Sequence, residues 1–167
     1  MHKKNDHCSF CGQRFVEGQP FPRTCAGCGN STYVNPLPVS VVLVPVDGGL
    51  LTVRRAIPPR QGMLALPGGF IGMGESWQQA GAREVFEETG LRLDPAEVTL
   101  FDVRSAPDGT VLIFGLAAPR TRADLSFVAN EEVSELCVQE PPAGGEPPTL
   151  AFPLHSQVAA AFFSRGA

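Results

Sequence analysis

One stretch of 23 residues, from Gly69 to Leu91, constrains the fold of this 167-residue chain more than any other. It opens with a glycine-rich loop, and residues 76–89 follow with the apolar spacing of an amphipathic helix. Ser76 is a suitable N-cap with Gln79 at the capping-box position, and Gly90 is a suitable helix stop. The stretch therefore predicts a loop followed by one well-defined helix.

The predicted helix carries an acidic cluster. At about 100° per residue, Glu84, Glu87 and Glu88 share one face. The opposite side, which is available for burial, carries Ala82, Val85, Phe86 and Thr89. Adjacent carboxylates on an exposed helix repel by about 0.2–0.5 kcal/mol per close pair, and Arg83, at i, i+4 from Glu87, offsets only part of this. The cluster suggests a divalent cation with oxygen ligands, while these residues alone also fit a solvated charged face.

The surrounding residues resemble the Nudix box, the signature of the Nudix hydrolases. The match runs from Gly69 through Glu75 to Arg83-Glu84-Val85-Phe86-Glu87-Glu88-Thr89-Gly90-Leu91, and it agrees at every specified position and spacing. The preceding Leu66-Pro67-Gly68 is similar to the family's usual approach to the box. The resemblance implies an α/β fold, a Nudix α/β/α sandwich with a mixed sheet.

The resemblance also implies a role for each charged residue of the box. Enzymes of this family use Mg²⁺ or Mn²⁺ to cleave a nucleoside diphosphate linked to another moiety. The implied metal ligands are Glu84, Glu87, Glu88 and the backbone carbonyl of Gly69. Arg83 matches the arginine that orients the catalytic carboxylates, so Glu84, Glu87 and Arg83 are the candidate catalytic residues. Glu75 matches the first glutamate of the box, which has a supporting role.

Charged residues outside the box are candidates for the general base and for phosphate contacts. In many relatives either a box glutamate or a glutamate from a late loop activates water. Glu132 and Glu135 resemble the late-loop pair, and Glu132 is the candidate base, with a solvated loop as the alternative. The candidate substrate-binding residues are Arg54, Arg55 and Arg60, whose guanidinium groups suit phosphate oxygens.

Three aromatic side chains near this region are of a size to stack on a nucleobase. They are Phe70, Trp77 and Phe114. We expect each of them in the hydrophobic core instead.

Four of the five cysteines form two C-x-x-C pairs near the N-terminus, namely Cys8, Cys11, Cys25 and Cys28. Each pair is followed by a glycine, which can turn the backbone tightly behind the sulfurs. Two such pairs make a closed four-thiolate site that suits structural Zn²⁺, while disulfides and a redox C-x-x-C are the alternatives. We therefore predict a four-cysteine zinc ribbon over residues 1–35 and a Nudix hydrolase domain over residues 36–167.

Charge and hydropathy narrow the classes of partner. The net charge of −4 comprises +2 in residues 1–35 and −6 in the rest, which argues against general electrostatic binding to nucleic acid or membrane. No apolar run approaches the ~18 residues needed to span a bilayer, and the first residues lack the apolar stretch of a signal peptide. A cytoplasmic location is expected, where disulfides are uncommon.

The remaining periodicity predicts the other elements. Strands are expected over residues 39–46, 50–54, 98–104, 110–117 and 133–138. A loop is expected over residues 141–148 and a helix over residues 155–164.

A zinc ribbon ahead of a Nudix domain is similar to two groups of enzymes. The resemblance to ADP-ribose and FAD pyrophosphatases covers nearly the whole chain. The resemblance to NADH pyrophosphatases is weaker, because Ser105-Ala106-Pro107-Asp108-Gly109 lacks their Ser-Gln-Pro-Trp segment. The expected function is hydrolysis of the diphosphate bond in a nucleotide-type small molecule such as ADP-ribose, FAD or NADH.

Other readings stay open. One is a nucleoside triphosphate pyrophosphohydrolase that cleans the nucleotide pool. Another is a nucleic-acid-binding zinc ribbon on an inactive Nudix scaffold. Capped RNA is a further candidate substrate. Because relatives are often homodimers, a homodimer is an expectation.

Overall fold

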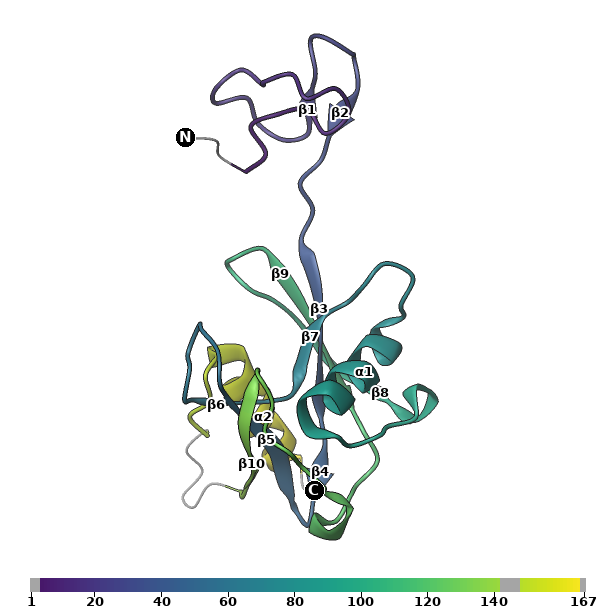
Figure 1. Ribbon diagram of the computed structural model, residues 1–167, viewed down its shortest axis with the longest axis vertical. Coiled ribbons are helices and arrows are strands. Elements are labelled where there is room, and N and C mark those ends of the chain that lie inside the picture. The colour runs from purple at the N-terminus through teal and green to yellow at the C-terminus, as the bar shows by residue number, and fades with distance from the viewer. Residues whose placement is uncertain (1–3, 142–147, 166–167) are drawn as a thin grey trace. The chain divides into compact units, whose positions relative to one another are not determined.

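The structure is a computed structural model that describes residues 4–141 and 148–165 (Figure 1). The chain forms two compact units, Met1–Pro36 and Leu37–Ala167. Most of the loop predicted over residues 141–148 lies outside the described residues. Within the described parts of the chain, none of the helices has the length and apolar character needed to cross a membrane.

The first unit is built around its cysteines. Its two short strands, β1 (Arg23–Thr24) and β2 (Ser31–Thr32), pair antiparallel. Its buried apolar cluster consists of Cys8, Phe15 and Cys25. So small a cluster cannot by itself offset the conformational entropy of ordering about 30 residues, so this unit needs a further source of stability.

In its described residues, the second unit contains two four-stranded sheets and two α-helices. Its elements are β3 (Leu37–Leu43), β4 (Pro45–Val46), β5 (Gly49–Arg55), β6 (Leu64–Ala65), β7 (Gly68–Phe70), α1 (Trp77–Thr89), η1 (Pro95–Glu97), β8 (Thr99–Ser105), β9 (Thr110–Leu116), η2 (Arg122–Asp124), β10 (Val133–Gln139) and α2 (Pro153–Ser164). One sheet has the order β7-β3-β9-β8, and the other has the order β10-β5-β4 with β6 also paired to β5. Only β3 and β9 pair in parallel among these described strands, so the predicted mixed sheet is confirmed.

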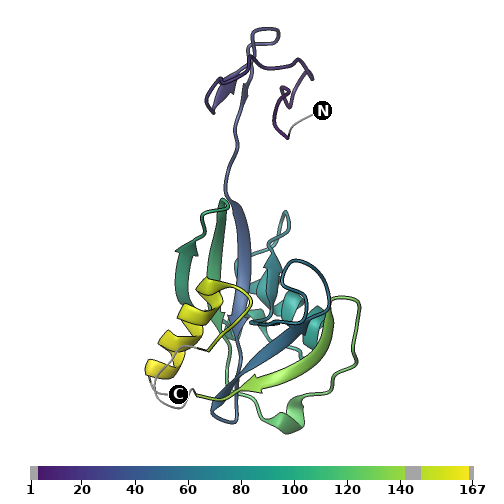
Figure 2. The same cartoon turned by 90° about the vertical axis from the view of Figure 1, so that its left-hand side faces the viewer.

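Alternating residues of β3 build the core on its two faces. Val41 and Leu43 pack in one cluster with residues of α2, whereas Val42 packs in a second cluster with Val85 of α1, as does Val44 directly after the strand. The two helices accordingly lie on either side of β3 (Figures 1 and 2). This arrangement is the predicted α/β/α sandwich.

Helix α1 begins and ends where the sequence predicts. The Ser76 side chain accepts a hydrogen bond from the backbone N–H of Gln79, and the Gln79 side-chain oxygen accepts one from the backbone N–H of Ser76. Gly90 ends the helix in the left-handed conformation. A Cβ atom on Gly81 would lie 2.7 Å from Val42, so this glycine lets the helix approach β3 closely. The expected burial of Phe86 is wrong, because the residue is 39% exposed and its ring lies beneath the guanidinium of Arg92.

Some boundaries differ from those predicted. The strand expected over residues 39–46 starts at Leu37 and is divided into β3 and β4. Strand β7 was not predicted, since glycine is rare in strands. It forms because Gly68 lets the backbone pair closely with Val41, where a Cβ atom would clash with the Ser40 carbonyl oxygen. Helix α2 begins at Pro153, two residues early, because proline suits the first helical position.

A buried histidine links α2 to the segment before β7. The Nδ1 atom of His155 accepts a hydrogen bond from the backbone N–H of Leu66 at 3.2 Å, and the ring packs against Phe114 and Phe152. Burial, reinforced by the positive charge of Arg55, lowers the pKa of His155 to about 4. The imidazole is therefore neutral in the folded protein at neutral pH.

We expect this histidine to make stability depend on pH. Its pKa is lower in the folded than in the unfolded chain, so the unfolded chain binds more protons between about pH 6.5 and pH 4. The free energy of unfolding should therefore fall by about 3 kcal/mol as the pH falls through this window. Urea unfolding from pH 7 to pH 5 measures the slope. His155→Asn should flatten it while keeping an acceptor for Leu66, and an unchanged slope would contradict the assignment.

Candidate active site

A cleft of about 640 Å³ gathers most of the predicted residues of the box. Its described lining comprises Arg55, Ile57, Gly68, Gly69, Phe70, Glu84, Glu87, Glu88, Asn130, Glu131 and Glu132. These residues come from the end of β5, from β7, from α1 and from the loop before β10. Segments far apart in the sequence therefore meet at one acidic surface.

Arg83 organises the carboxylates on one side of the cleft. Its guanidinium donates two hydrogen bonds to Glu75, at 2.7 and 3.1 Å. It also donates to Glu84 at 2.8 Å, to Glu87 at 2.9 Å and to the Phe70 carbonyl oxygen at 3.1 Å. These five bonds match the five N–H groups of an arginine. Arg83 is thereby committed to holding protein groups in place, and it lowers the pKa of Glu75.

Glu84 lies against the backbone of β7. An ideal Cβ atom on Gly69 would be 2.5 Å from the Glu84 carboxylate, so a side chain at this position would displace the carboxylate from where it lies. The Glu84 side chain is 14% exposed, and burial raises its pKa even though Arg83 opposes the shift. The carboxylate of Glu84 and the main chain of Gly69 thus lie together at the cleft.

Glu88 is the most buried of the three helix carboxylates. The residue is 8% exposed, and its Oε2 accepts a hydrogen bond from the backbone N–H of Gly68 at 3.0 Å. Burial raises the pKa of Glu88 to about 8, against the effect of that hydrogen bond. A cation bound beside this carboxyl group would stabilise its ionised form and compensate the cost of burying its charge.

Glu132 reaches the same cleft from the loop before β10. Its negative charge adds to the pKa increase that burial causes in both Glu84 and Glu88. The backbone carbonyl of Glu132 accepts a hydrogen bond from Ala56 at 2.7 Å, which ties the loop to the end of β5. Glu135, the other member of the predicted pair, is not among the residues that line the cleft.

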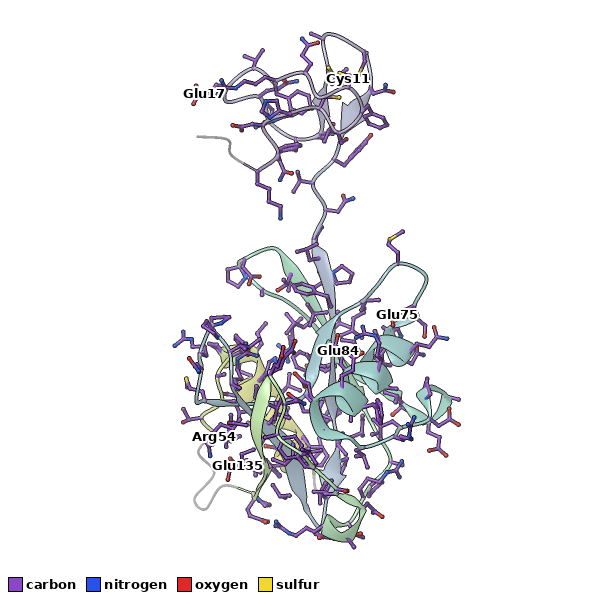
Figure 3. All side chains as sticks on the ribbon, in the orientation of Figure 1. Cys11, Glu17, Arg54, Glu75, Glu84 and Glu135 are labelled. Atoms are coloured by element: carbon purple, nitrogen blue, oxygen red, sulfur yellow. The ribbon has the colours of Figure 1, made fainter. Side chains whose placement is uncertain are left out.

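The three arginines predicted to bind substrate lie at three different places in the structure. Arg55 lines the cleft, where its Nε donates to the Pro59 carbonyl oxygen at 2.8 Å and its guanidinium lies over the Phe152 ring. Arg54 forms a salt bridge with Glu135 at 2.6 Å, and Figure 3 shows this pair away from Glu84 of α1 and from Glu75 in the loop before that helix. Arg60 lines a separate hollow beside the start of α2. The structure thus brings one of the three to the carboxylates.

The four N-terminal thiols form a second candidate site. Their sulfur atoms all lie within 4.8 Å of one another, with 3.7 Å between Cys8 and Cys28 and 3.6 Å between Cys11 and Cys25. These distances exceed the ~2.05 Å of a disulfide bond and match the ~3.8 Å between thiolates of a tetrahedral Zn²⁺ site. The donor set and its spacing therefore fit zinc.

The two cysteine pairs share one backbone geometry. Gly12 donates a hydrogen bond to the Cys8 carbonyl oxygen at 2.9 Å, and Gly29 donates to that of Cys25 at 2.8 Å. Both glycines have a positive φ, 76° and 73°, which other residues rarely adopt. Hydrogen bonds from the backbone N–H groups of Cys11 and Phe10 lower the pKa of Cys8 to about 6, which favours the thiolate that binds metal.

Comparison with known proteins decides the family. The family profile described as the NUDIX domain matches residues 34–159, which is most of the chain. The chain belongs to the Nudix family. The solved structure of a NUDIX hydrolase from Nitrosomonas europaea superposes with a TM-score of 0.74 at 26% identity, covering 96% of this chain and 91% of that one.

Two curated relatives resemble part of this Nudix chain. The NAD-capped RNA hydrolase NudC of Edwardsiella ictaluri is 34% identical over 87 residues, 52% of this chain and 34% of the relative. The ADP-ribose pyrophosphatase of Methanocaldococcus jannaschii is 38% identical over 76 residues, 46% of this chain and 44% of the relative. The matches thus span less than half the length of these relatives.

Two residues at the Nudix cleft have surroundings that the sequence did not indicate. Phe70 is 59% exposed and lines the cleft, so its expected place in the core is wrong, whereas Phe114 is fully buried and Trp77 packs against the core as expected. Asn130 bonds to the main chain of α1, 43 residues earlier in the sequence. An asparagine in a polar loop carries no periodic signal, and only the tertiary contact shows its place.

Proposed function

We propose that this Nudix protein is a divalent-metal-dependent pyrophosphohydrolase that cleaves the diphosphate bond of a nucleoside diphosphate linked to another moiety. The observation that carries the proposal is the convergence of Glu84, Glu87, Glu88 and Glu132 on one open cleft beside the main chain of Gly69. Arg55 supplies a positive side chain at the same cleft. This arrangement suits an anionic substrate that is bound together with a cation.

The residues present fit Mg²⁺ or Mn²⁺. Glu84, Glu87 and Glu88 offer carboxylate oxygens and Gly69 offers a carbonyl oxygen, and oxygen atoms are the ligands that these cations prefer. The hydrogen bonds to Arg83 and Gly68 each use one oxygen of a carboxylate that has two. A bound cation supplies positive charge that neutralises diphosphate oxygens and makes a water nucleophile more acidic.

The chain's own groups divide the remaining work. We propose that Arg55 contacts a substrate phosphate and that Arg83 and Glu75 keep Glu84 and Glu87 in position. We propose Glu132 as the general base that accepts the proton of the attacking water, because it faces the helix carboxylates from the opposite loop. A general base of this kind typically contributes about 10²- to 10⁴-fold to the rate.

ADP-ribose, FAD and NADH are the proposed substrates. The names of the two curated relatives support this class, since one acts on ADP-ribose and the other on NAD-capped RNA. Purified protein should be incubated with Mg²⁺ and each of ADP-ribose, FAD, NADH, an NAD-capped RNA and 8-oxo-dGTP, and the products identified. Release of two monophosphates supports the proposal, whereas pyrophosphate from the triphosphate alone indicates pool cleaning. No turnover on any of them contradicts both.

We also propose Zn²⁺ as the structural ion of the first unit, held by Cys8, Cys11, Cys25 and Cys28. The geometry of the thiols supports a closed site without catalytic chemistry. We propose a cytoplasmic location, where disulfides are uncommon and cysteines serve as metal ligands instead. The expected homodimer stays a prediction that light scattering during size-exclusion chromatography checks.

A further inference from the structure

One carboxamide joins the Glu132 loop to the helix that carries the acidic cluster. The Nδ2 group of Asn130 donates a hydrogen bond to the Glu87 carbonyl oxygen at 3.0 Å, near the C-terminal end of α1. Its Oδ1 atom accepts hydrogen bonds from the backbone N–H groups of Glu132 at 3.0 Å and Val133 at 2.8 Å. A single side chain thus fixes both the turn of the loop and its attachment to α1.

Polar bonds rather than burial hold this loop. Asn130, Glu131 and Glu132 are all exposed, and Val133 is the first buried residue after them. Besides the Asn130 side chain, backbone bonds from Asn130 to Val133 and from Ala56 to Glu132 attach the loop. Losing the carboxamide would therefore remove a large part of what keeps the loop in place.

The attachment holds the loop against electrostatic repulsion. Glu132 lines the cleft together with Glu84, Glu87 and Glu88, so carboxyl groups from the loop and from α1 meet at one surface. Negative charges at one surface repel one another, and this repulsion opposes the attachment of the loop. A neutral carboxamide provides the attachment without adding charge, and it satisfies a helix carbonyl that lacks an intrahelical partner.

We propose that Asn130 is a positioning residue that holds Glu132 at the cleft and acts on hydrolysis through Glu132. The proposal rests on the proposed function, since it assigns Glu132 a part in the reaction. It goes beyond the box, because Asn130 lies outside it and belongs to a different loop.

The test compares Asn130→Ala in the wild-type and Glu132→Gln proteins. In the wild-type background kcat should fall by about tenfold or more with KM changed less than about threefold. In the Glu132→Gln background the same change should lower kcat by less than about twofold, because the effects of changing two residues that act as a unit are not additive. Equal losses in both backgrounds, or Glu132→Gln with wild-type kcat, would overturn the proposal.

Asp108→Ala is the matched control. Asp108 also caps an exposed turn, accepting from the backbone N–H of Thr110 at 3.0 Å, but it does not line the cleft. Its removal should leave kcat within about twofold, as a surface change away from the site does. Glu97→Gln, on η1, controls for the charge lost in Glu132→Gln.

A second measurement does not depend on turnover. Amide hydrogen exchange at Ala56 and Val133 should become about tenfold faster in Asn130→Ala and stay unchanged in Asp108→Ala, because the loop opens locally. Unchanged exchange would overturn the positioning role even in an active enzyme. If the wild-type protein turned over none of the substrates, the proposed function would be contradicted. Faster exchange in Asn130→Ala would then still support the attachment of the loop by Asn130.

Discussion

Glu87→Gln is expected to lower kcat/KM for Mg²⁺-dependent hydrolysis by about 100-fold or more, which is a loss of about 3 kcal/mol of transition-state stabilisation. The change replaces a carboxylate by a neutral amide of nearly the same size. The Glu87 side chain is 54% exposed, so the fold does not depend on it. Steady-state kinetics at several Mg²⁺ concentrations measure the loss, and the apparent Mg²⁺ affinity should fall with it.

The matched control is Glu97→Gln on η1, which removes the same charge from an exposed position outside the cleft. It should keep kcat/KM within about twofold, because distant exposed charges are screened by salt. Glu87→Gln with activity within about threefold of wild type would remove Glu87 from the set of metal ligands. A comparable loss in both variants would point to the net charge of the chain rather than to a ligand.

Local signals explain why α1 was predictable in detail. The capping pair Ser76 and Gln79, the stop at Gly90 and the helical spacing between them lie within one short segment. Because these interactions connect residues near in sequence, a single sequence shows them directly. The burial of Glu88 was not predictable in this way, since it arises from its hydrogen bond to Gly68 on another element.

The pairing of distant strands decides which arginine lies at the cleft, and the sequence alone does not show this pairing. Arg54 and Arg55 are neighbours on one strand, and successive side chains of a strand point to opposite faces. The sequence alone does not show which face meets the carboxylates. In the fold Arg54 lies opposite Glu135 in the register between β5 and β10 and pairs with it, which leaves Arg55 at the cleft. The position of Asn130 depends on the same long-range pairing.

Cys25→Ser is expected to reduce bound zinc from about one ion per chain to nearly none, because a structural site depends on all four ligands. Cys25 is buried at the centre of the first unit, and the apolar cluster there contains only Cys8 and Phe15 besides. Without the ion, residues 4–36 should lose their order. Zinc analysis after dialysis against a chelator and amide hydrogen exchange of the Gly12 and Gly29 turns measure the two effects.

Hydrolysis should respond differently from zinc content. All residues that line the acidic cleft belong to the second compact unit, so kcat of Cys25→Ser should stay within about threefold of wild type, as changes without contact to the reacting groups do. Cys137→Ser is the matched control, since this half-buried thiol lies on β10, outside the thiol cluster, and should leave zinc unchanged. Full zinc retention in Cys25→Ser would contradict the four-thiolate site. A large loss of kcat in Cys25→Ser while the second unit stays folded would instead show that the ribbon takes part in the reaction.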